Sequence, residues 1–459
     1  RMRLPPTSTS PGRTRGAGFH ALWLVSVLTA LAAAQEPGEC PPAAWPQWRG
    51  PLATGVAPHA DPPVEWSATR NVRWRVLLPG RGHATPIIWG ERIYVQTAVP
   101  ADLSPDSRPA ASTSPTTAES TGRTYKFTLL ALDRQTGQTV WAQTLCEGGL
   151  HERGHNDASP ASNSPVTDGE CLIAYFGSRG LYGLDLDGKL LWSQDLGDME
   201  TRRGFGEGSS PALHGDLVVV NWDHEGDSFI VALDKRTGAE RWRVPRDEPT
   251  SWSTPHIVTA GGQVQVIVSA TRKIRSYDLQ TGRMLWECGG MTQNVIPTPV
   301  SDRDLIYCTS GFRGSALLAI RYAVAQGDIA GSAAVAWTYE GKGTPYVPSP
   351  LLYEGRLYFL QENRAALSCV DARTGRAEYS KQRLEGLRDV YASPVAANGR
   401  VYIAGRDGKV AVIQAGSELR VLAVNELADS FTASPAIVGR ALYLRGAEHL
   451  YCIAEPEPK

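Results

Sequence analysis

The chain has 459 residues, with 46 basic and 47 acidic side chains, a formal net charge of −1 and 42% hydrophobic residues. Because the charges balance, the chain is unlike proteins that bind nucleic acid or membrane surfaces through a large net positive charge. Its hydrophobic content is sufficient for a folded core. The 46 glycines and 32 prolines indicate many tight turns, and 13 tryptophans against 4 methionines favour an all-β fold.

Residues 1–34 have the pattern of a secretory signal peptide. Arginines precede an apolar run over residues 17–34, which ends in three alanines at Ala34 and is short for a membrane anchor. We expect cleavage near Ala34 and export to the periplasm or the extracellular space. Cys40 lacks the small preceding residues of a lipid-attachment site, and no later segment is apolar enough to span a bilayer.

Residues 71–454 repeat one unit eight times, between an N-terminal extension (35–70) and a tail (455–459). Every unit opens with a proline. Proline has no N–H to donate to a neighbouring strand, and a sheet tolerates this at the first residue of a strand. These prolines are Pro86, Pro165, Pro211, Pro255, Pro299, Pro350, Pro394 and Pro435. From Pro165 onward they lie on average 45 residues apart, with four short strand signals per unit. This period is typical of a β-propeller blade.

A turn of the form Asp-x-x-Thr-Gly recurs late in the units, where the Asp side chain bonds the backbone and the glycine takes a positive φ. It occurs at 133–137, 234–238, 278–282 and 371–375. An aromatic residue stands about four positions later, and we interpret this set as packing between blades rather than as ligand contacts. The set, with its counterpart near the N-terminus, is Trp74, Trp141, Trp192, Trp242, Trp286, Trp337 and Tyr379.

The eighth unit, residues 434–454, holds only three strand signals. Residues 71–76, which include Trp74, read as the missing outer strand and would close the ring without an open sheet edge. The sequence therefore predicts an all-β, eight-bladed propeller of four-stranded antiparallel blades, closed by an N-terminal strand around Trp74. Residues 100–124 are rich in Pro, Ser, Thr and Ala, and predict a disordered insertion in the first blade. A second insertion is expected over residues 146–159.

The repeat, Ser-Pro followed by Ala-Leu-Asp-x-x-Thr-Gly-x-x-x-Trp, resembles the PQQ-like propeller repeat of quinoprotein alcohol dehydrogenases and of the assembly factor BamB. The opening Trp-Pro-Gln-Trp-Arg-Gly-Pro at 45–51 resembles the start of secreted planctomycete propellers of this type. The resemblance covers residues 45–454 and implies the fold more strongly than any function.

The resemblance also implies which residues a PQQ cofactor would need in this chain. Quinoprotein dehydrogenases typically hold PQQ between a tryptophan and a disulfide of adjacent cysteines, beside a calcium ion. Here the seven cysteines include no adjacent pair, and no Cys-x-x-Cys-His haem motif occurs. We therefore expect no cofactor, with PQQ and calcium as the alternative. Which cysteines pair is left open.

Loops that enter each inner strand and loops between the second and third strands of a blade lie on one face of a propeller. These loops provide a candidate ligand-binding face that combines an arc of arginines with an acidic sector and aromatic residues. Its members are His155, Asp157, Arg179, Glu207, Asp223, His224, Trp252, Arg272, Arg313, Tyr346, Arg364 and Arg406. Guanidinium groups suit carboxylates or phosphates; the alternative is that these are solvated turn residues that pair across blades.

Two clusters are weak candidates for a metal site. Asp223, Glu225 and Asp227 could offer oxygens to calcium, although they lack the spacing of an EF-hand loop. His151 and His155 lie near Asp157, but surrounding glycines make this segment a loop without a third ligand nearby. No catalytic motif is evident, so we assign no catalytic residue.

Three functions remain open from the sequence. The favoured interpretation is an exported, non-catalytic, monomeric scaffold that binds an envelope or secreted protein or peptide, as BamB does. The alternatives are a divergent PQQ-dependent oxidoreductase and a carbohydrate- or polyanion-binding module.

Overall fold

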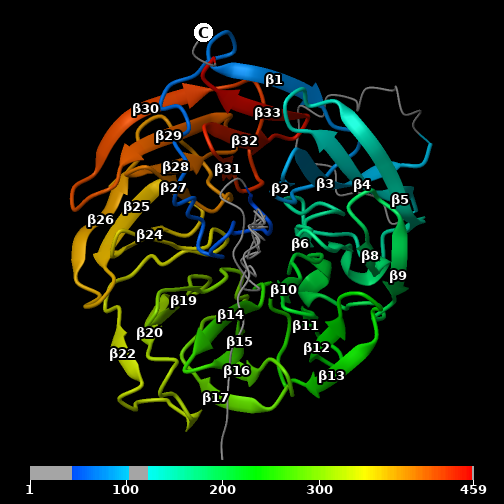
Figure 1. The fold of residues 1–459 in the computed structure, drawn as a ribbon. Coiled ribbons are helices and arrows are strands. Elements are labelled where there is room, and N and C mark those ends of the chain that lie inside the picture. The colour runs from blue at the N-terminus through cyan, green and yellow to red at the C-terminus, as the bar shows by residue number, and fades with distance from the viewer. Residues whose placement is uncertain (1–43, 103–121, 457–459) are drawn as a thin grey trace, which may run out of the picture. The chain divides into compact units, whose positions relative to one another are not determined.

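The computed structural model describes residues 44–102 and 122–456, which belong to a compact unit spanning Cys40–Lys459. Within these residues the strands form eight antiparallel sheets around one axis, and the only helical segments are two short 3-10 turns (Figure 1). The predicted eight-bladed propeller is confirmed. The predicted signal peptide, Cys40 and most of the first insertion lie outside the described residues.

The first four blades follow the chain in order. Blade 1 contains β2 (Ile87–Trp89), β3 (Arg92–Pro100), β4 (Thr124–Asp133) and β5 (Thr139–Gly149). Blade 2 contains β6 (Val166–Thr167), β7 (Leu172–Tyr175), β8 (Leu181–Leu184) and β9 (Leu190–Gln194), with the turn η1 (Gly177–Arg179) between β7 and β8. The turn η2 (Arg202–Gly204) precedes blade 3, which contains β10 (Ala212–His214), β11 (Leu217–Trp222), β12 (Phe229–Asp234) and β13 (Glu240–Pro245). Blade 4 contains β14 (His256–Ala260), β15 (Gln263–Ser269), β16 (Ile274–Asp278) and β17 (Met284–Cys288), and β21 (Gly327–Asp328) pairs in parallel with β17.

The other four blades complete the circle. Blade 5 contains β18 (Val300–Ser301), β19 (Ile306–Ser310), β20 (Ala316–Ile320) and β22 (Val335–Thr338). Blade 6 contains β23 (Leu351–Tyr353), β24 (Arg356–Leu360), β25 (Ala366–Asp371) and β26 (Ala377–Arg383). Blade 7 contains β27 (Val395–Ala397), β28 (Arg400–Ala404), β29 (Lys409–Gln414) and β30 (Arg420–Glu426). Blade 8 contains β31 (Ala436–Val438), β32 (Ala441–Arg445), β33 (His449–Ala454) and β1 (Val72–Leu77).

Both predicted insertions begin within strands, and the first also ends in one. Pro100 ends β3 and Thr124 begins β4, and the two strands pair through Pro100 and Tyr125. The outer strand β5 likewise continues to Gly149, so the second insertion is a loop only from residue 150 onward.

The ring closes as predicted, because β1 pairs antiparallel with β33 and places Trp74 opposite Cys452. The indole of Trp74 lies on Gly137 of blade 1 and donates its N–H to the carbonyl of Arg134 at 3.1 Å. Blade 8 is thus tied to blade 1 by a side chain from the N-terminal strand.

Other blades are joined in the same way at their outer edges. Each indole covers the turn glycine of the next blade, where an added Cβ would approach the ring to between 2.6 and 2.9 Å. The further pairs are Trp141 on Gly188, Trp192 on Gly238, Trp242 on Gly282 and Trp337 on Gly375. Trp286 does not make this contact, because blade 5 has no Asp-x-x-Thr-Gly turn for it to cover. It is buried, and its indole N–H donates to the side-chain oxygen of Gln265 in its own blade at 3.0 Å. Tyr379 packs in the core of blades 6 and 7.

A ring of buried hydroxyl groups links the inner strands; we call it the hydroxyl ring. Its members directly precede the eight strand-opening prolines and are Thr85, Ser164, Ser210, Thr254, Thr298, Ser349, Ser393 and Ser434. The backbone N–H of each of the first seven donates to the hydroxyl of the next blade at 2.9–3.0 Å. The Thr85 hydroxyl donates to the carbonyl of Ser434 at 3.1 Å and completes the circle.

The N-terminal extension crosses the axis near the centre of the ring (Figure 1). Trp45 pairs with Ile88 of blade 1, and Val56 pairs with Ala396 of blade 7, two blades away around the ring. Between them, the guanidinium of Arg49 donates to the carbonyls of Thr54, Pro350 and Pro394 at 3.0–3.1 Å. The segment therefore closes one end of the central channel.

We expect Ser349→Ala to lower the free energy of unfolding by about 1–3 kcal/mol, because the buried N–H of Thr298 loses its acceptor. Urea unfolding followed by tryptophan fluorescence measures the change. The matched control is Ser380→Ala in the exposed part of β26, which should change the stability by less than about 0.5 kcal/mol. Equal effects of the two substitutions would contradict a structural role for the hydroxyl ring.

Candidate functional site

A cavity of about 360 Å³ lies on the axis, above the N-terminal extension. Every one of the eight loops that enter the blades contributes to its wall, so it opens on the face that carries these loops, which we call the loop face. Its side chains include Trp48, His83, His155, Asp157, Phe205, Glu207, Trp252, Ile296, Phe312, Tyr346, Val347, Tyr391 and Thr432, with Ser164, Ser210, Ser393 and Ser434 of the hydroxyl ring.

The walls of the cavity are mainly aromatic. Phe312 and Tyr346 stack with their ring centroids 4.7 Å apart and an interplanar angle of 25°. Trp252 is fixed by a hydrogen bond from its indole N–H to the carbonyl of Gly206 at 2.7 Å. Rings held in this way provide a preformed apolar surface for a ligand.

Residues 150–160, which we call the strap, cross the loop face. Glu152 accepts hydrogen bonds from the backbone and the hydroxyl of Thr201, which lies before blade 3. At the other end, Asp157 forms an ion pair with Arg406 of blade 7 at 2.8 Å and accepts a hydrogen bond from Tyr391 at 3.1 Å. The strap therefore narrows the opening of the cavity.

Glu207 has an unusual environment at the edge of the cavity. Its carboxylate accepts from the backbone N–H of Ser178 at 2.7 Å and from the hydroxyl of the same residue. Burial raises the pKa of Glu207 to about 7 and Glu152 adds to this shift, whereas the Ser178 bonds and Arg179 oppose it. The carboxyl therefore changes its charge near neutral pH.

Two buried arginines hold backbone carbonyls next to the hydroxyl ring: Arg49 those of Pro350 and Pro394, and Arg445 that of Ala84. Arg49 and Arg445 have no ion-pair partner among the described residues, and burial lowers the pKa of each to about 9, so both stay charged at neutral pH. Burial and the charges of Arg445, Arg81 and Arg406 lower the pKa of His83 to about 3, so its imidazole is neutral.

The structure brings together only part of the predicted face. His155, Asp157, Glu207, Trp252 and Tyr346 line the cavity.

The predicted arginines do not meet there. Arg179 pairs with Asp198 at 2.8 Å, Arg364 lies 3.5 Å from Glu362, and Arg406 holds Asp157. Arg272 donates to the carbonyl of Asp247 at 2.7 Å, and Arg313 lies over the ring of Phe312.

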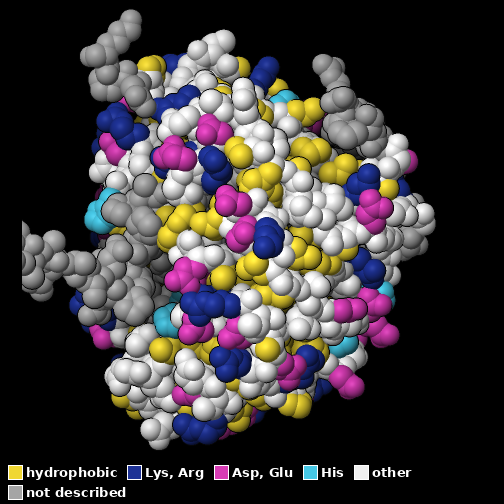
Figure 2. Space-filling model, turned by 45° about the vertical axis from the view of Figure 1, so that its right-hand side comes forward, with side chains coloured by type: hydrophobic (Ala, Val, Ile, Leu, Met, Phe, Trp, Pro, Cys, Tyr) yellow, Lys and Arg dark blue, Asp and Glu magenta, His cyan; other side chains and the backbone are white. Residues whose placement is uncertain are grey.

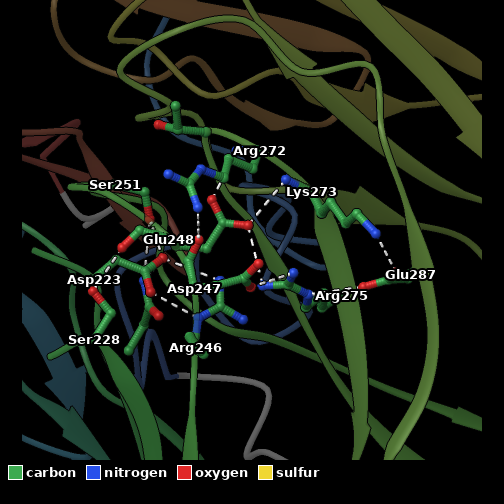
Figure 3. Close-up of polar contacts among 12 residues, drawn as sticks. Asp223, Ser228, Arg246, Asp247, Glu248, Ser251, Arg272, Lys273, Arg275 and Glu287 are labelled. Carbon is green, nitrogen blue, oxygen red and sulfur yellow. Dashed lines mark hydrogen bonds and ion pairs between the residues drawn. The ribbon is translucent and has the colours of Figure 1, made fainter.

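Asp223 lies in a buried polar network between blades 3 and 4 (Figure 3). Its carboxylate binds the guanidinium of Arg246 through two contacts of 2.7 and 3.1 Å, and Ser251 donates to it at 2.6 Å. Both charged side chains are fully buried. The network continues from Glu248 through Arg275 to Glu287 (Figure 3).

The weak metal candidates are thus separated. The oxygens of Asp223 are taken by protein donors, Glu225 accepts from Thr250, and Asp227 is exposed. His224 accepts from the backbone N–H of Glu200 at 3.1 Å. Across residues 44–102 and 122–456, no three His, Cys, Asp or Glu side chains are grouped so that they could hold a metal ion.

The residues present also do not fit the PQQ arrangement of the quinoproteins. The six described cysteines are dispersed among the strands of the blades, and none lines the cavity. With no adjacent pair anywhere in the sequence, the disulfide side of the cofactor sandwich cannot form.

Several cavity residues were not predicted as site residues from the sequence. They include Trp48, Phe205, Phe312 and Tyr391 in the walls and the hydroxyl ring at the floor. The ring had a detectable signal, because a Ser or Thr precedes every strand-opening proline. The wall residues had none, since they lie at different positions in loops of different length.

Comparison with known proteins identifies the family. The sequence profile of the family described as outer membrane protein assembly factor BamB matches residues 101–244 and 226–456. A search of curated proteins gave no match.

Solved structures show the same fold at low sequence identity. BamB from Moraxella catarrhalis is 13% identical with a TM-score of 0.55, over 83% of this chain and 98% of that one. A europium-containing methanol dehydrogenase is 12% identical with a TM-score of 0.63, over 90% of this chain and 98% of that one. The quinohemoprotein alcohol dehydrogenase of Comamonas testosteroni is 12% identical with a TM-score of 0.58, over 91% and 81%. These likenesses establish the propeller fold alone.

We expect Asp223→Ala to lower the free energy of unfolding by about 3–5 kcal/mol, because it leaves the buried Arg246 without its counter-ion. Denaturant unfolding measures the loss. The control is Asp304→Ala, which breaks an exposed contact with Arg373 at 3.7 Å and should cost less than about 1 kcal/mol. A loss below 1 kcal/mol for Asp223→Ala would show that the buried pair is not structural.

Glu207→Gln should remove a pH-dependent part of the stability. The folded pKa of about 7 lies above the ordinary value of 4.5, so this carboxyl stabilises the fold fully below about pH 4.5 and loses that effect as the pH rises through 7. Between pH 4.5 and about pH 7, the free energy of unfolding of the wild type should therefore fall by at most about 3 kcal/mol relative to that of the Gln variant. Unfolding curves of both proteins from pH 4.5 to 8 measure the difference, and a difference independent of pH would refute the raised pKa.

Proposed function

The chain belongs to the family of the outer membrane protein assembly factor BamB, and from this premise we propose that it is an exported, non-catalytic scaffold. It binds a protein partner in the cell envelope, as a monomer, with its loop face. Among the described residues no helix is long and apolar enough to cross a bilayer.

One observation carries this proposal: the loop face presents a preformed aromatic cavity whose ionisable groups are occupied by other protein groups. Asp157 is held by Arg406 and Tyr391, and Glu207 is held by Ser178. Side chains that are fixed in this way give the cavity a rigid surface that suits binding.

The surface charge supports a protein partner rather than a polyanion. On the side shown in Figure 2, acidic, basic and hydrophobic side chains are interspersed and no region of one sign dominates. The predicted arginines are dispersed among neighbouring acids and carbonyls, so they do not form a polyanion site. Trp252 and Tyr346, which a sugar would need, do line the cavity; a sugar-binding module is therefore the second candidate function.

Site-specific photocrosslinking in cells that export the chain tests the proposal. A photoreactive residue in place of the exposed Arg364, on the loop face, should capture one envelope protein. The matched control replaces Arg303, which is exposed in the turn between β18 and β19 at the opposite end of the blade, and should capture none. Equal capture at both positions, or none at either, would contradict binding through the loop face.

A titration with PQQ, with and without calcium, tests the oxidoreductase alternative. We expect no saturable quenching of tryptophan fluorescence and no oxidation of alcohols or sugars in a dye-coupled assay. Saturable binding with turnover would replace the scaffold proposal by an enzymatic one.

A further inference from the structure

The floor of the central cavity is a surface of hydrogen-bond donors. Thr85 is the only member of the hydroxyl ring whose hydroxyl donates its proton to a protein acceptor among the residues described. The others only accept there, each from a backbone N–H of the preceding blade. Ser434 even accepts twice, from the backbone N–H of Ser393 and from the indole of Trp48 at 3.3 Å. The four members that line the cavity therefore have hydroxyl protons free for a ligand.

Buried positive charge lies next to the hydroxyl ring. Arg49 donates to the carbonyls of Pro350 and Pro394, each of which follows a member of the hydroxyl ring. Arg445 donates to the carbonyl of Ala84, beside Thr85, at 3.1 Å. Both guanidinium groups are about 2–3% exposed and lack a carboxylate partner in the described part of the chain. Buried charges without a counter-ion act over longer distances than exposed ones.

Above the floor, the walls of the cavity suit a ligand with a flat apolar part. Trp252, Phe312 and Tyr346 supply ring faces, and 360 Å³ is within the range of small-molecule sites. The strap and its ion pair from Asp157 to Arg406 restrict the opening, which favours a small molecule over an extended chain.

We propose that the central cavity binds a small aromatic or apolar carboxylic acid, with its carboxylate on the hydroxyl ring and its apolar body between the aromatic walls. A carboxylate only accepts hydrogen bonds, so it matches a floor with free hydroxyl protons, and its charge complements the buried arginines. This site is the cavity at the centre of the loop face, so the inference deepens the proposed binding function, while its test uses the isolated protein and needs no partner.

Calorimetric titration of the purified protein with three matched ligands tests the chemistry. 3-Phenylpropionate should bind at least about tenfold more tightly than 3-phenylpropionamide, because a hydrogen bond to a charged group is worth more than one to a neutral group. 3-Phenylpropylamine should not bind. Equal affinity for the acid and the amide, or tighter binding of the amine, would overturn the proposal.

The C-terminus of a peptide is also a carboxylate and can follow an aromatic side chain. The peptide Gly-Gly-Phe is therefore titrated in two forms, one with a free carboxyl end and one with an amidated end. We expect the free small acid to bind more tightly than either peptide. Binding of the free-ended peptide alone would overturn the assignment to a small molecule and indicate a protein terminus instead.

Two substitutions in the hydroxyl ring separate binding from stability. Ser210→Ala removes a hydroxyl that lines the cavity, whereas Ser349→Ala removes an equivalent interblade bond at a position away from it. Both should destabilise the fold alike, but only Ser210→Ala should weaken binding, by about tenfold for the acid and by less for the amide, whose carbonyl accepts a weaker hydrogen bond.

A wall variant keeps the test informative if Ser210→Ala does not fold. Tyr346→Ala should weaken the acid and the amide by the same factor, because it removes apolar contact only. If neither substitution changes either affinity, the ligand does not occupy this cavity. All these titrations use the isolated protein, so a negative result leaves the crosslinking test of the partner surface unaffected.

Discussion

The propeller depends on one repeated hydrogen bond, which joins seven of the eight pairs of neighbouring blades. It runs from the backbone N–H before a strand-opening proline to the hydroxyl of the next blade. The proline fixes the direction of the inner strand and has no N–H of its own to satisfy. The preceding Ser or Thr therefore supplies both the donor to one blade and the acceptor to the other. The hydrogen bond from the Thr85 hydroxyl to the Ser434 carbonyl makes the eighth link, so neighbouring blades are joined at the axis around the whole circle.

The outer edges of the blades are also joined by one repeated contact, which is aromatic packing. An indole from one blade covers a turn glycine of the next, where any Cβ would collide, and in four of the pairs the indole N–H reaches a backbone carbonyl. Hydrogen bonds at the centre and aromatic packing at the rim together keep the blades in register. Trp74 shows that closure follows the same rule, since the strand that carries it comes from the other end of the sequence.

The candidate site is a consequence of this closed ring. Eight radial blades leave a space on the axis, and the N-terminal extension fills one end of it through Arg49. What remains is a pocket with one opening, a polar floor and apolar walls. Its charged groups are mostly neutralised by neighbours, with Asp157 held by Arg406 and Glu207 placed where its pKa is near 7. This combination fits recognition of a partner or a ligand better than chemistry on it.

The sequence by itself determined the repeat, the number of blades and the closing strand, because the strand-opening proline, the Asp-x-x-Thr-Gly turn and the indole are local signals that recur at a fixed period. It did not determine the site. Asp157 and Tyr391 are 234 positions apart and meet only because the circle brings blades 2 and 7 to the same opening. The predicted arginine arc does not form one anion site, because each guanidinium is taken by a different group: Asp198, the Asp247 carbonyl, the Phe312 ring, Glu362 and Asp157. Which loop residues reach the axis depends on loop length and packing across the ring, and only the tertiary structure decided that.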